Sequence, residues 1–276
     1  MWSPNGRYKR EDFSYSVAKL IRFTIGRMRD RRPMLSLPPI YRPAEIGSEQ
    51  DPFAHARDAA ARGDADGTFI WASRTDRAEC AVVLAPDRPL TASCLAAPVT
   101  MLGIGEALGA LVPPAVAVTY GWPDRIDVNG ATAGGIRVAV GGSGKPEAVP
   151  EWMVTAVSLA VAGDPADASP GRAVDRTSLF EEGCGEVTAR QFLESFARHF
   201  LHWLNRWQDD GFGPVRGAWN ARASNIGEPV ALDLGGALHA GISRGIDENG
   251  ALLLEADGET ERLDLLPALK APTWTL

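Results

Sequence analysis

Residues 120–138, YGWPDRIDVNGATAGGIRV, decide the fold of this chain. Ile126 and Val128 alternate with polar neighbours, which is the period of a half-buried β-strand. Asn129-Gly130 follows them, and both residue types tolerate the positive φ angles of a two-residue hairpin turn. Gly134-Gly135 opens the return strand, and paired glycines in a strand indicate that another backbone or a ligand comes very close. We therefore predict a β-hairpin whose paired glycines, called the floor glycines below, lie very close to another backbone or a ligand.

The pair Trp122-Pro123 stands just before the first strand of this hairpin. We expect it at the mouth of that strand, where a proline is tolerated because no ladder donor is needed. If the backbone runs extended through this pair, Gly121, Pro123 and Arg125 point to the same side, because side chains alternate along a strand.

The length and composition favour an ordinary globular protein. A chain of 276 residues allows one large domain or one medium and one small domain. A hydrophobic content of 45% and a charged content of 23% predict a substantial core. Cys80, Cys94 and Cys184 are few and far apart, so we expect a reducing compartment, the cytoplasm, and no disulfide framework.

Charge is unevenly distributed along the chain. Residues 1–33 carry nine Lys and Arg against three acids, which leaves −13 for the rest of a chain whose formal net charge is −7. An acidic body disfavours a nucleic-acid partner, because such surfaces need positive charge. The basic segment has an apolar helical face that suits a membrane surface, but a disordered or non-native tail is the favoured interpretation, since MLSLPP from Met34 resembles a natural start. We therefore expect no membrane partner.

We expect three parts: the tail at 1–33, an α/β domain at 34–226 and a small β domain at 227–276. Within the α/β domain an extended entry at 35–42 precedes the first helix, and Pro98 lies at the start of the second. The predicted helices cover 49–62, 98–111, 189–209 and 215–222, and the predicted strands outside the hairpin cover 68–71, 80–84 and 152–161.

No metal site is expected. The cysteines and histidines lack zinc-ligand spacing. His199 and His202 are three residues apart on a predicted helix, and such a pair beside aromatic neighbours is more often packing than a metal site.

The central motif resembles that of the biotin/lipoate protein ligase family, whose usual form is K-W-P-N-D-(I/L)-x-(V/L)-x-x-x-K-(L/V)-A-G-I. The residues that match it are Trp122, Pro123, Ile126, Val128, Gly135 and Ile136, with Gly134 in place of the alanine. Thr177-Ser178-Leu179 is similar to the family's T-S-L-x-E turn, and GISRGIDENGALLL at 241–254 resembles the SH3-like C-terminal domain of biotin–protein ligases. The resemblance covers residues 34–276 in order. It implies a class II synthetase-like α/β core with a mixed sheet flanked by helices, plus a small SH3-like barrel.

The sequence departs from the family where positive charge is expected. Gly121 occupies the position of the catalytic lysine, Asp124-Arg125 replaces Asn-Asp, and Thr132 stands in for a second lysine. The family's glycine- and arginine-rich loop corresponds to residues 72–79, which contain no glycine and only Arg74 and Arg77 as cations. That segment is either a reduced anion-binding loop or a polar hairpin connection.

The resemblance implies a ligase that uses ATP with Mg²⁺ to convert a carboxylic acid (biotin, or lipoate or octanoate) into an acyl-adenylate. The acyl group then passes to a lysine of a biotinyl or lipoyl carrier domain. The alternative is a catalytically degenerate family member that binds a small acid, a nucleotide or a carrier domain without ligation. We expect Arg125 to replace the missing lysine as the catalytic cation. The other expected substrate-binding residues are Trp71, Arg74, Arg77, Gly121, Trp122, Pro123, Asp124, Gly134, Gly135 and Ile136.

Overall fold

A computed structural model describes residues 35–63, 66–163 and 175–276. The basic segment at 1–33 lies outside the described residues. Residues Leu37–Leu276 form one compact unit, to which the following description applies.

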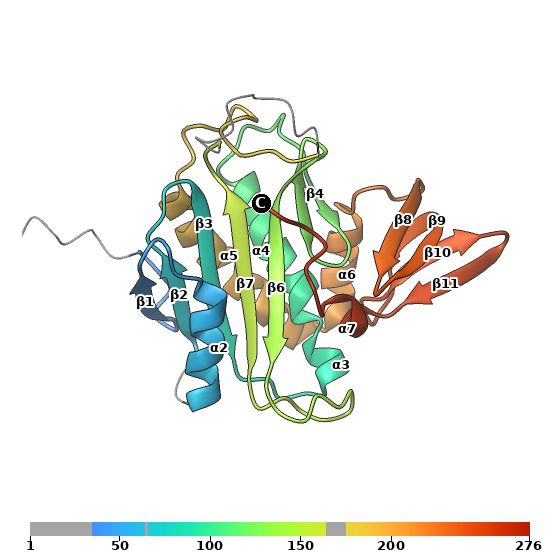
Figure 1. Ribbon diagram of the computed structural model, residues 1–276, viewed down its shortest axis with the longest axis horizontal. Helices are drawn as coiled ribbons and strands as arrows, with labels where there is room; N and C mark the ends of the chain where they lie inside the picture. Colours follow the sequence, from blue (N-terminus) through green and yellow to red (C-terminus); the bar gives the residue numbers. More distant parts are fainter. Residues whose placement is uncertain (1–34, 64–65, 164–174) are drawn as a thin grey trace, which may run out of the picture. The chain divides into compact units, whose positions relative to one another are not determined.

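Seven strands form the main sheet, in the order β1-β2-β3-β7-β6-β5-β4 (Figure 1). β1 runs parallel to β2 and the remaining neighbours are antiparallel, so the sheet is mixed. The strands are β1 (Arg42–Ile46), β2 (Thr68–Ala72), β3 (Arg77–Leu84), β4 (Val118–Gly121), β5 (Arg125–Val128), β6 (Ala131–Val140) and β7 (Met153–Ala160).

Helices cover both faces of this sheet, which confirms the predicted α/β core. In Figure 1, α2 (Pro52–Arg62) lies in front of the sheet, and α4 (Ala96–Gly109), α5 (Ala189–Asp210) and α6 (Phe212–Asn220) lie behind it. Ala56 and Ala60 of α2 pack on Ala81 of β3 and Ala156 of β7. These buried side chains show that the α2 face carries the odd-numbered positions of β3 and the even-numbered positions of β7.

Helix boundaries follow their capping residues. Asp51 caps α2 by accepting a hydrogen bond from the backbone N–H of Phe53. Thr188 and Gln191 form a complete capping box at the start of α5. Phe192, Phe196 and Phe200 stack along α5, which confirms that its aromatic seam belongs to the core.

Two helices begin earlier in the structure than the sequence indicates, and one of them is α6, which starts at Phe212 and not at residue 215. α4 starts at Ala96, two residues before the predicted Pro98, and the short helix α3 (Leu90–Ser93) precedes it. Gly103 of α4 faces the backbone of Phe200, and a Cβ there would lie 3.0 Å from its Cα. Gly103 therefore allows α4 to pack closely against α5.

Strand β1 was not predicted. Its sequence, RPAEI, is short and mostly exposed and contains Pro43. It lies at the edge of the sheet, where a proline and polar side chains are tolerated, and therefore lacks the hydrophobic pattern of an inner strand.

The central hairpin is confirmed. β5 and β6 pair around Asn129 (φ 49°) and Gly130 (φ 90°), the left-handed pair that such a turn needs. The expected extended path through Trp122-Pro123 is wrong. These residues, with a cis peptide bond between them, form a turn that joins β4 to β5, and Gly121 and Arg125 face each other across it as paired residues.

The C-terminal residues form an antiparallel sheet in the order β11-β10-β9-β8. Asn220 of α6 links this sheet to the core, because its side chain donates to the Ile246 carbonyl (3.1 Å) and accepts from the Ile246 N–H (2.8 Å). Trp122 Nε1 donates to the Gly250 carbonyl at 3.0 Å. The elements are β8 (Pro229–Leu234), β9 (Ala237–Ile246), β10 (Leu252–Ala256), β11 (Glu259–Leu263) and α7 (Leu265–Ala268).

One helical stretch, Leu90–Gly109, is long and apolar enough to cross a membrane by length and composition alone. However, 83% of its most apolar window is buried inside the protein. This burial is typical of a core helix.

Candidate functional site

A row of five paired residues crosses the sheet on the α2 face. Gly121 of β4 pairs with Arg125 of β5, Arg125 pairs with Gly135 of β6, and Gly135 pairs with Ser158 of β7. Ser158 pairs in turn with Glu79 of β3. Directly paired residues of antiparallel strands project to the same face, so this row brings an arginine, a hydroxyl, a carboxylate and two glycines together.

Arg125 occupies the space above Gly121. A Cβ added at Gly121 would lie 2.8 Å from Arg125 Nε and 2.9 Å from its Cζ and Nη2. The guanidinium therefore fills the volume into which a side chain at position 121 would project. Arg125 reaches this place from the neighbouring strand, and not along one extended strand as the sequence had suggested.

Asp127 holds the Arg125 guanidinium. Arg125 Nε donates to Asp127 Oδ1 at 2.9 Å, and Nη2 donates to Oδ2 at 3.1 Å. Thr132 Oγ1, at the position of the second family lysine, donates to Asp127 Oδ1 at 3.2 Å. The hydrogen bonds from Arg125 to Asp127 all use the Nε and Nη2 edge of the guanidinium. The side chain of Arg125 is 33% exposed. The Nη1 edge of the guanidinium is therefore outside this ion pair.

The two glycines of the floor are covered by protein. A Cβ at Gly134 would collide with the Ser158 carbonyl, and Leu159 Cα would lie only 2.9 Å away. A Cβ at Gly135 would collide with the Asp124 carbonyl and with the indole of Trp274. The predicted close approach is therefore made by strand β7, by the β4–β5 turn and by the C-terminal segment.

The C-terminal segment binds the central motif through three hydrogen bonds. The N–H of Thr273 donates to Asp124 Oδ2 at 3.0 Å, and its hydroxyl donates to Asp124 Oδ1. Trp274 Nε1 donates to the Ile136 carbonyl at 3.2 Å. The C-terminal segment crosses in front of β6 in Figure 1. No feature of the motif itself indicated these contacts, because Thr273 is 149 positions from Asp124 and Trp274 is 138 positions from Ile136.

Asp124 is a buried carboxyl group with a perturbed pKa. It is 2% exposed, and burial raises its pKa to about 6 although the Thr273 bonds oppose the shift. At pH 7 it is therefore ionised and accepts both bonds from Thr273. The family resemblance predicted that Asp124 binds substrate. In the structure its carboxylate binds Thr273 of the same chain.

The loop between β2 and β3 carries the expected cation Arg74. Its guanidinium donates to both carboxylate oxygens of Asp76, at 3.1 and 2.6 Å, and approaches Glu79 at 3.5 Å. The hydrogen bond from Arg74 lowers the pKa of Asp76. Ser158 Oγ donates to Glu79 at 2.8 Å, which connects this loop to the row. Arg77 approaches Asp76 only at 3.9 Å.

A further arginine on this face was not predicted. Arg137 of β6 donates to the Asp51 carboxylate at 3.1 and 2.7 Å, at the N-terminus of α2, and lies 4.6 Å from the ring centre of Phe53. Burial favours neutral Asp51, but the bond and charge of Arg137 lower its pKa. The sequence could have placed Arg137 on this face, because it follows Gly135 by two residues and side chains alternate along a strand.

Other predicted site residues lie elsewhere. Trp71 pairs with Cys80, and the register continues through Val157 to Ile136, so these side chains project to the face opposite the row. Trp71 is buried beside Phe69, with ring centres 6.4 Å apart. Ile136 contributes its carbonyl group to the site. Trp122 is buried against the C-terminal sheet, and Pro123 lies in the β4–β5 turn.

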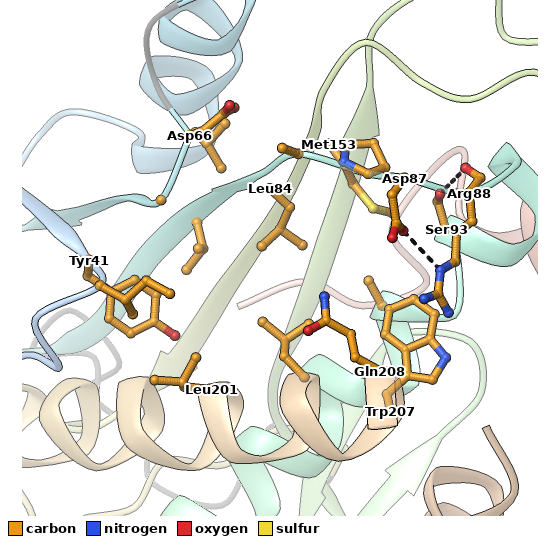
Figure 2. A pocket seen from close by; sticks show the side chains of 18 of the residues that line it. Tyr41, Asp66, Leu84, Asp87, Arg88, Ser93, Met153, Leu201, Trp207 and Gln208 are labelled. Atoms are coloured by element: carbon orange, nitrogen blue, oxygen red, sulfur yellow. Dashed lines mark hydrogen bonds and ion pairs between the residues drawn. The ribbon is translucent and has the colours of Figure 1, made fainter. Parts of the chain in front are cut away.

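A cavity of about 410 Å³ lies away from this row (Figure 2). Its walls are formed by the end of β3, the start of β7 and the last turns of α5, and the Asp87–Arg88 pair lies on one side. Leu84, Met153, Leu201 and Trp207 supply apolar surface. No predicted site residue lines it, so it is separate from the central motif. Within the described ranges, no three His, Cys, Asp or Glu side chains gather as metal ligands.

Two family models match the chain. The model of the biotin/lipoate A/B protein ligase family matches residues 37–221, and that of the biotin protein ligase C terminal domain matches residues 226–264. A biotin–[acetyl-CoA-carboxylase] ligase from Paracoccus denitrificans is 35% identical over 173 residues, covering 63% of this chain and 71% of the relative. A bifunctional ligase/repressor from Bacillus subtilis is 26% identical over 202 residues, covering 70% of this chain and 55% of that protein.

Solved structures share the fold. A biotin protein ligase-like protein of unknown function from Silicibacter sp. TM1040 has a TM-score of 0.77 and 34% identity, covering 86% of this chain and 100% of its own. The Aquifex aeolicus biotin protein ligase, in complex with biotin and ATP, has a TM-score of 0.63 at 17% identity, with coverage of 80% and 95%. The second likeness shows the fold alone.

Proposed function

Because the chain belongs to the biotin/lipoate A/B protein ligase family, we propose that it is a biotin–protein-ligase-like enzyme. It uses ATP, which arrives with Mg²⁺, to activate biotin or a related acid such as lipoate or octanoate. It then transfers the acyl group to a lysine of a carrier domain. The position of the Arg125 guanidinium above Gly121 carries this proposal, because it supplies a cation where the family's catalytic lysine is missing.

The reaction needs positive charge at one point. In the first step a carboxylate oxygen of the acid forms a bond to the α-phosphorus of ATP, and pyrophosphate leaves. Two anions must meet for this to happen, and a fixed cation that contacts both lowers the barrier. In the second step the carrier lysine attacks the acyl carbonyl carbon, loses a proton, and AMP leaves.

Arg125 is suited to this task by its anchoring. Asp127 fixes the guanidinium through its Nε and Nη2 edge, so little side-chain freedom is lost when an anion binds the remaining N–H groups. The ion pair with Asp127 offsets part of the guanidinium charge, so Arg125 contributes its remaining positive charge together with oriented N–H donors. Arg74, on the β2–β3 loop, and Arg77, at the start of β3, are the second candidates for phosphate contacts.

Adenylate formation tests the proposal directly. Purified protein is incubated with ATP, Mg²⁺ and biotin, lipoate or octanoate in turn, and acid-dependent pyrophosphate release is measured. We expect turnover with at least one acid and a loss of about 10²–10³-fold in Arg125→Ala, in line with the removal of one charge-stabilising donor. Arg244→Ala, which breaks a comparable surface pair with Glu255 at 2.8 Å, is the control and should keep its rate. An Arg125→Ala variant that forms adenylate at the wild-type rate would exclude this role.

A second function is favoured by the charge pairing of the site. Arg74, Arg125 and Arg137 are each bound to a carboxylate, and Trp274 lies on Gly135. A protein with this arrangement suits binding of a small acid, a nucleotide or a carrier domain without ligation. Calorimetric binding of biotin, octanoate or ATP in the absence of any adenylate turnover would support this second function and exclude the first.

A further inference from the structure

The C-terminal residues occupy the surface on which the proposed acid would bind. Trp274 lies directly above Gly135, and Thr273 takes both oxygens of the Asp124 carboxylate. Gly135 pairs with Arg125, so the indole lies next to the proposed catalytic cation in the row. A ligand that approaches Arg125 from the side of Gly135 therefore meets Trp274 first.

The contact is specific in its chemistry. Asp124 accepts one bond from a backbone N–H and one from a hydroxyl, and the Ile136 carbonyl accepts one from an indole N–H. The missing Cβ at Gly135 makes room for the indole ring. Asp124, Gly135 and the Ile136 carbonyl together hold an apolar ring and three hydrogen-bond donors.

The same contact is small enough to be reversible. Residues 269–276 follow α7 without regular secondary structure, and Ala271, Pro272, Thr273 and Thr275 are exposed. Three hydrogen bonds and one half-buried indole hold the segment, and a ligand or water that donates to Asp124 and to the Ile136 carbonyl can replace those bonds. None of the described helices or strands includes residues 271–276, so the segment can leave without unfolding another element.

We infer that Asp124, Gly135 and the Ile136 carbonyl form an acid-binding groove, that residues 271–276 are a strap that occupies it, and that substrate must displace Thr273 and Trp274 to bind. This inference rests on the proposed function for the identity of the competing ligand. Strap and ligand exclude one another, so the strap lowers the apparent affinity for the acid by the fraction of molecules in which the groove is free. A ligand competes with the strap by covering Gly135 with apolar surface, and a ligand with N–H groups that donate to Asp124 and to the Ile136 carbonyl competes better.

Two variants test the strap: a chain that ends at Lys270, and full-length Trp274→Ala. Biotin and octanoate are titrated calorimetrically into each and into the wild type. We expect at least tenfold tighter binding in both variants, and no change in Thr275→Ala, whose exposed side chain serves as the control. Thermal unfolding confirms that the shortened chain is folded, and Trp274→Ala provides the same comparison if it is not. Equal affinities in wild type and both variants would overturn the strap.

A peptide experiment separates the strap from the proposed function. A synthetic peptide of residues 271–276, APTWTL, is added to the chain that ends at Lys270, and its binding is followed by fluorescence anisotropy. Binding that is lost in Asp124→Ala supports the groove, whereas an absence of binding overturns it. If the peptide binds but neither acid binds any form, the proposed acid substrate is excluded and the self-recognition of the groove stands.

Discussion

Arg125 and Gly121 show how a neighbouring side chain fills the space of a missing one. The family's lysine is absent at position 121, but the cross-strand partner of that position is an arginine whose guanidinium fills the space. A lysine at 121 and Arg125 in its present position would exclude one another sterically and repel electrostatically. The two departures from the family motif are thus best understood as one coupled change.

Position 135 tests how tightly the groove is packed. Gly135→Ala places a methyl group against the Asp124 carbonyl, which is backbone, and against Trp274. We expect a loss of about 1–3 kcal/mol in the free energy of unfolding, as is typical of overpacking, together with release of the indole. Urea unfolding and tryptophan fluorescence measure the two effects.

Gly217→Ala is the matched control for that variant. Gly217 lies on α6, and a Cβ added there would have no heavy atom within 4 Å, so alanine should leave stability unchanged or raise it by up to about 1 kcal/mol. If both glycine variants lost stability equally, the packing over Gly135 would not be the cause.

Asp124 makes a second prediction at the scale of one residue. Its pKa is about 6 in the folded protein and near 3.8 when unfolded, so the folded state binds the proton more tightly. Its contribution to stability is therefore fully present below pH 4 and is lost as the pH rises through 6. Relative to Asp124→Asn, which does not titrate, the wild type should lose on the order of 3 kcal/mol between pH 4 and pH 7.

Urea unfolding of both proteins at pH 4, 5, 6 and 7 measures this difference, because the other titrating groups cancel between them. Arg125 and Thr273 are the charged and polar neighbours that lower the pKa of Asp124. Parallel stability curves would contradict the prediction.

Individual residues were predicted where their neighbours in sequence determine their role. The close approach of other backbone to the floor glycines falls into this group, whereas the place of Arg125 above Gly121 depends on cross-strand pairing and its catalytic role stays a prediction. The partners of those residues were not predictable: Asp51 reaches Arg137 across 86 positions and Thr273 reaches Asp124 across 149. Such pairs depend on how strands and termini meet in three dimensions, which no local pattern encodes.

Elements were predictable where their sequence is periodic and their ends are marked. α5 has an apolar seam and a Thr–Gln capping box, and its start at Ala189 was predicted. β1 lacks a pattern because it lies at an exposed edge. The turn at Trp122-Pro123-Asp124 is not predicted, because an extended strand through these residues accounts equally well for the residues on either side.

The capping box provides the prediction for an element. Thr188→Ala removes the oxygen that accepts from the Gln191 N–H, so we expect a loss of about 1 kcal/mol in unfolding free energy. Thr188→Ser keeps that oxygen and should keep the stability within a few tenths of a kcal/mol of the wild type. Thermal and urea unfolding compare the three proteins, and equal losses in both variants would show that the methyl group, not the cap, matters.

For the whole molecule, the attachment of the C-terminal sheet connects fold and site. Trp122 and Asp124 flank the same proline, yet Trp122 bonds to Gly250 and Asp124 bonds to Thr273. The central turn therefore holds the C-terminal sheet on one side and the strap on the other. Movement of the C-terminal sheet would therefore shift Trp122 and Asp124, and through them the surroundings of Gly135.

A substitution at Asn220 loosens the attachment of the C-terminal sheet to the core without changing a residue of the candidate site. Asn220→Ala removes both bonds to Ile246, and we expect faster hydrogen–deuterium exchange of amides in β8–β11, while amides of β3 and β7 keep their protection. The cost, about 1–3 kcal/mol for the two buried groups left unpaired, falls on the attachment of the sheet. Asn205→Ala, at an exposed position of α5, should change neither region. Exchange that rises equally in both sheets would mean that the chain unfolds as one cooperative unit, and the turn could then not relay movement of the C-terminal sheet separately from the core.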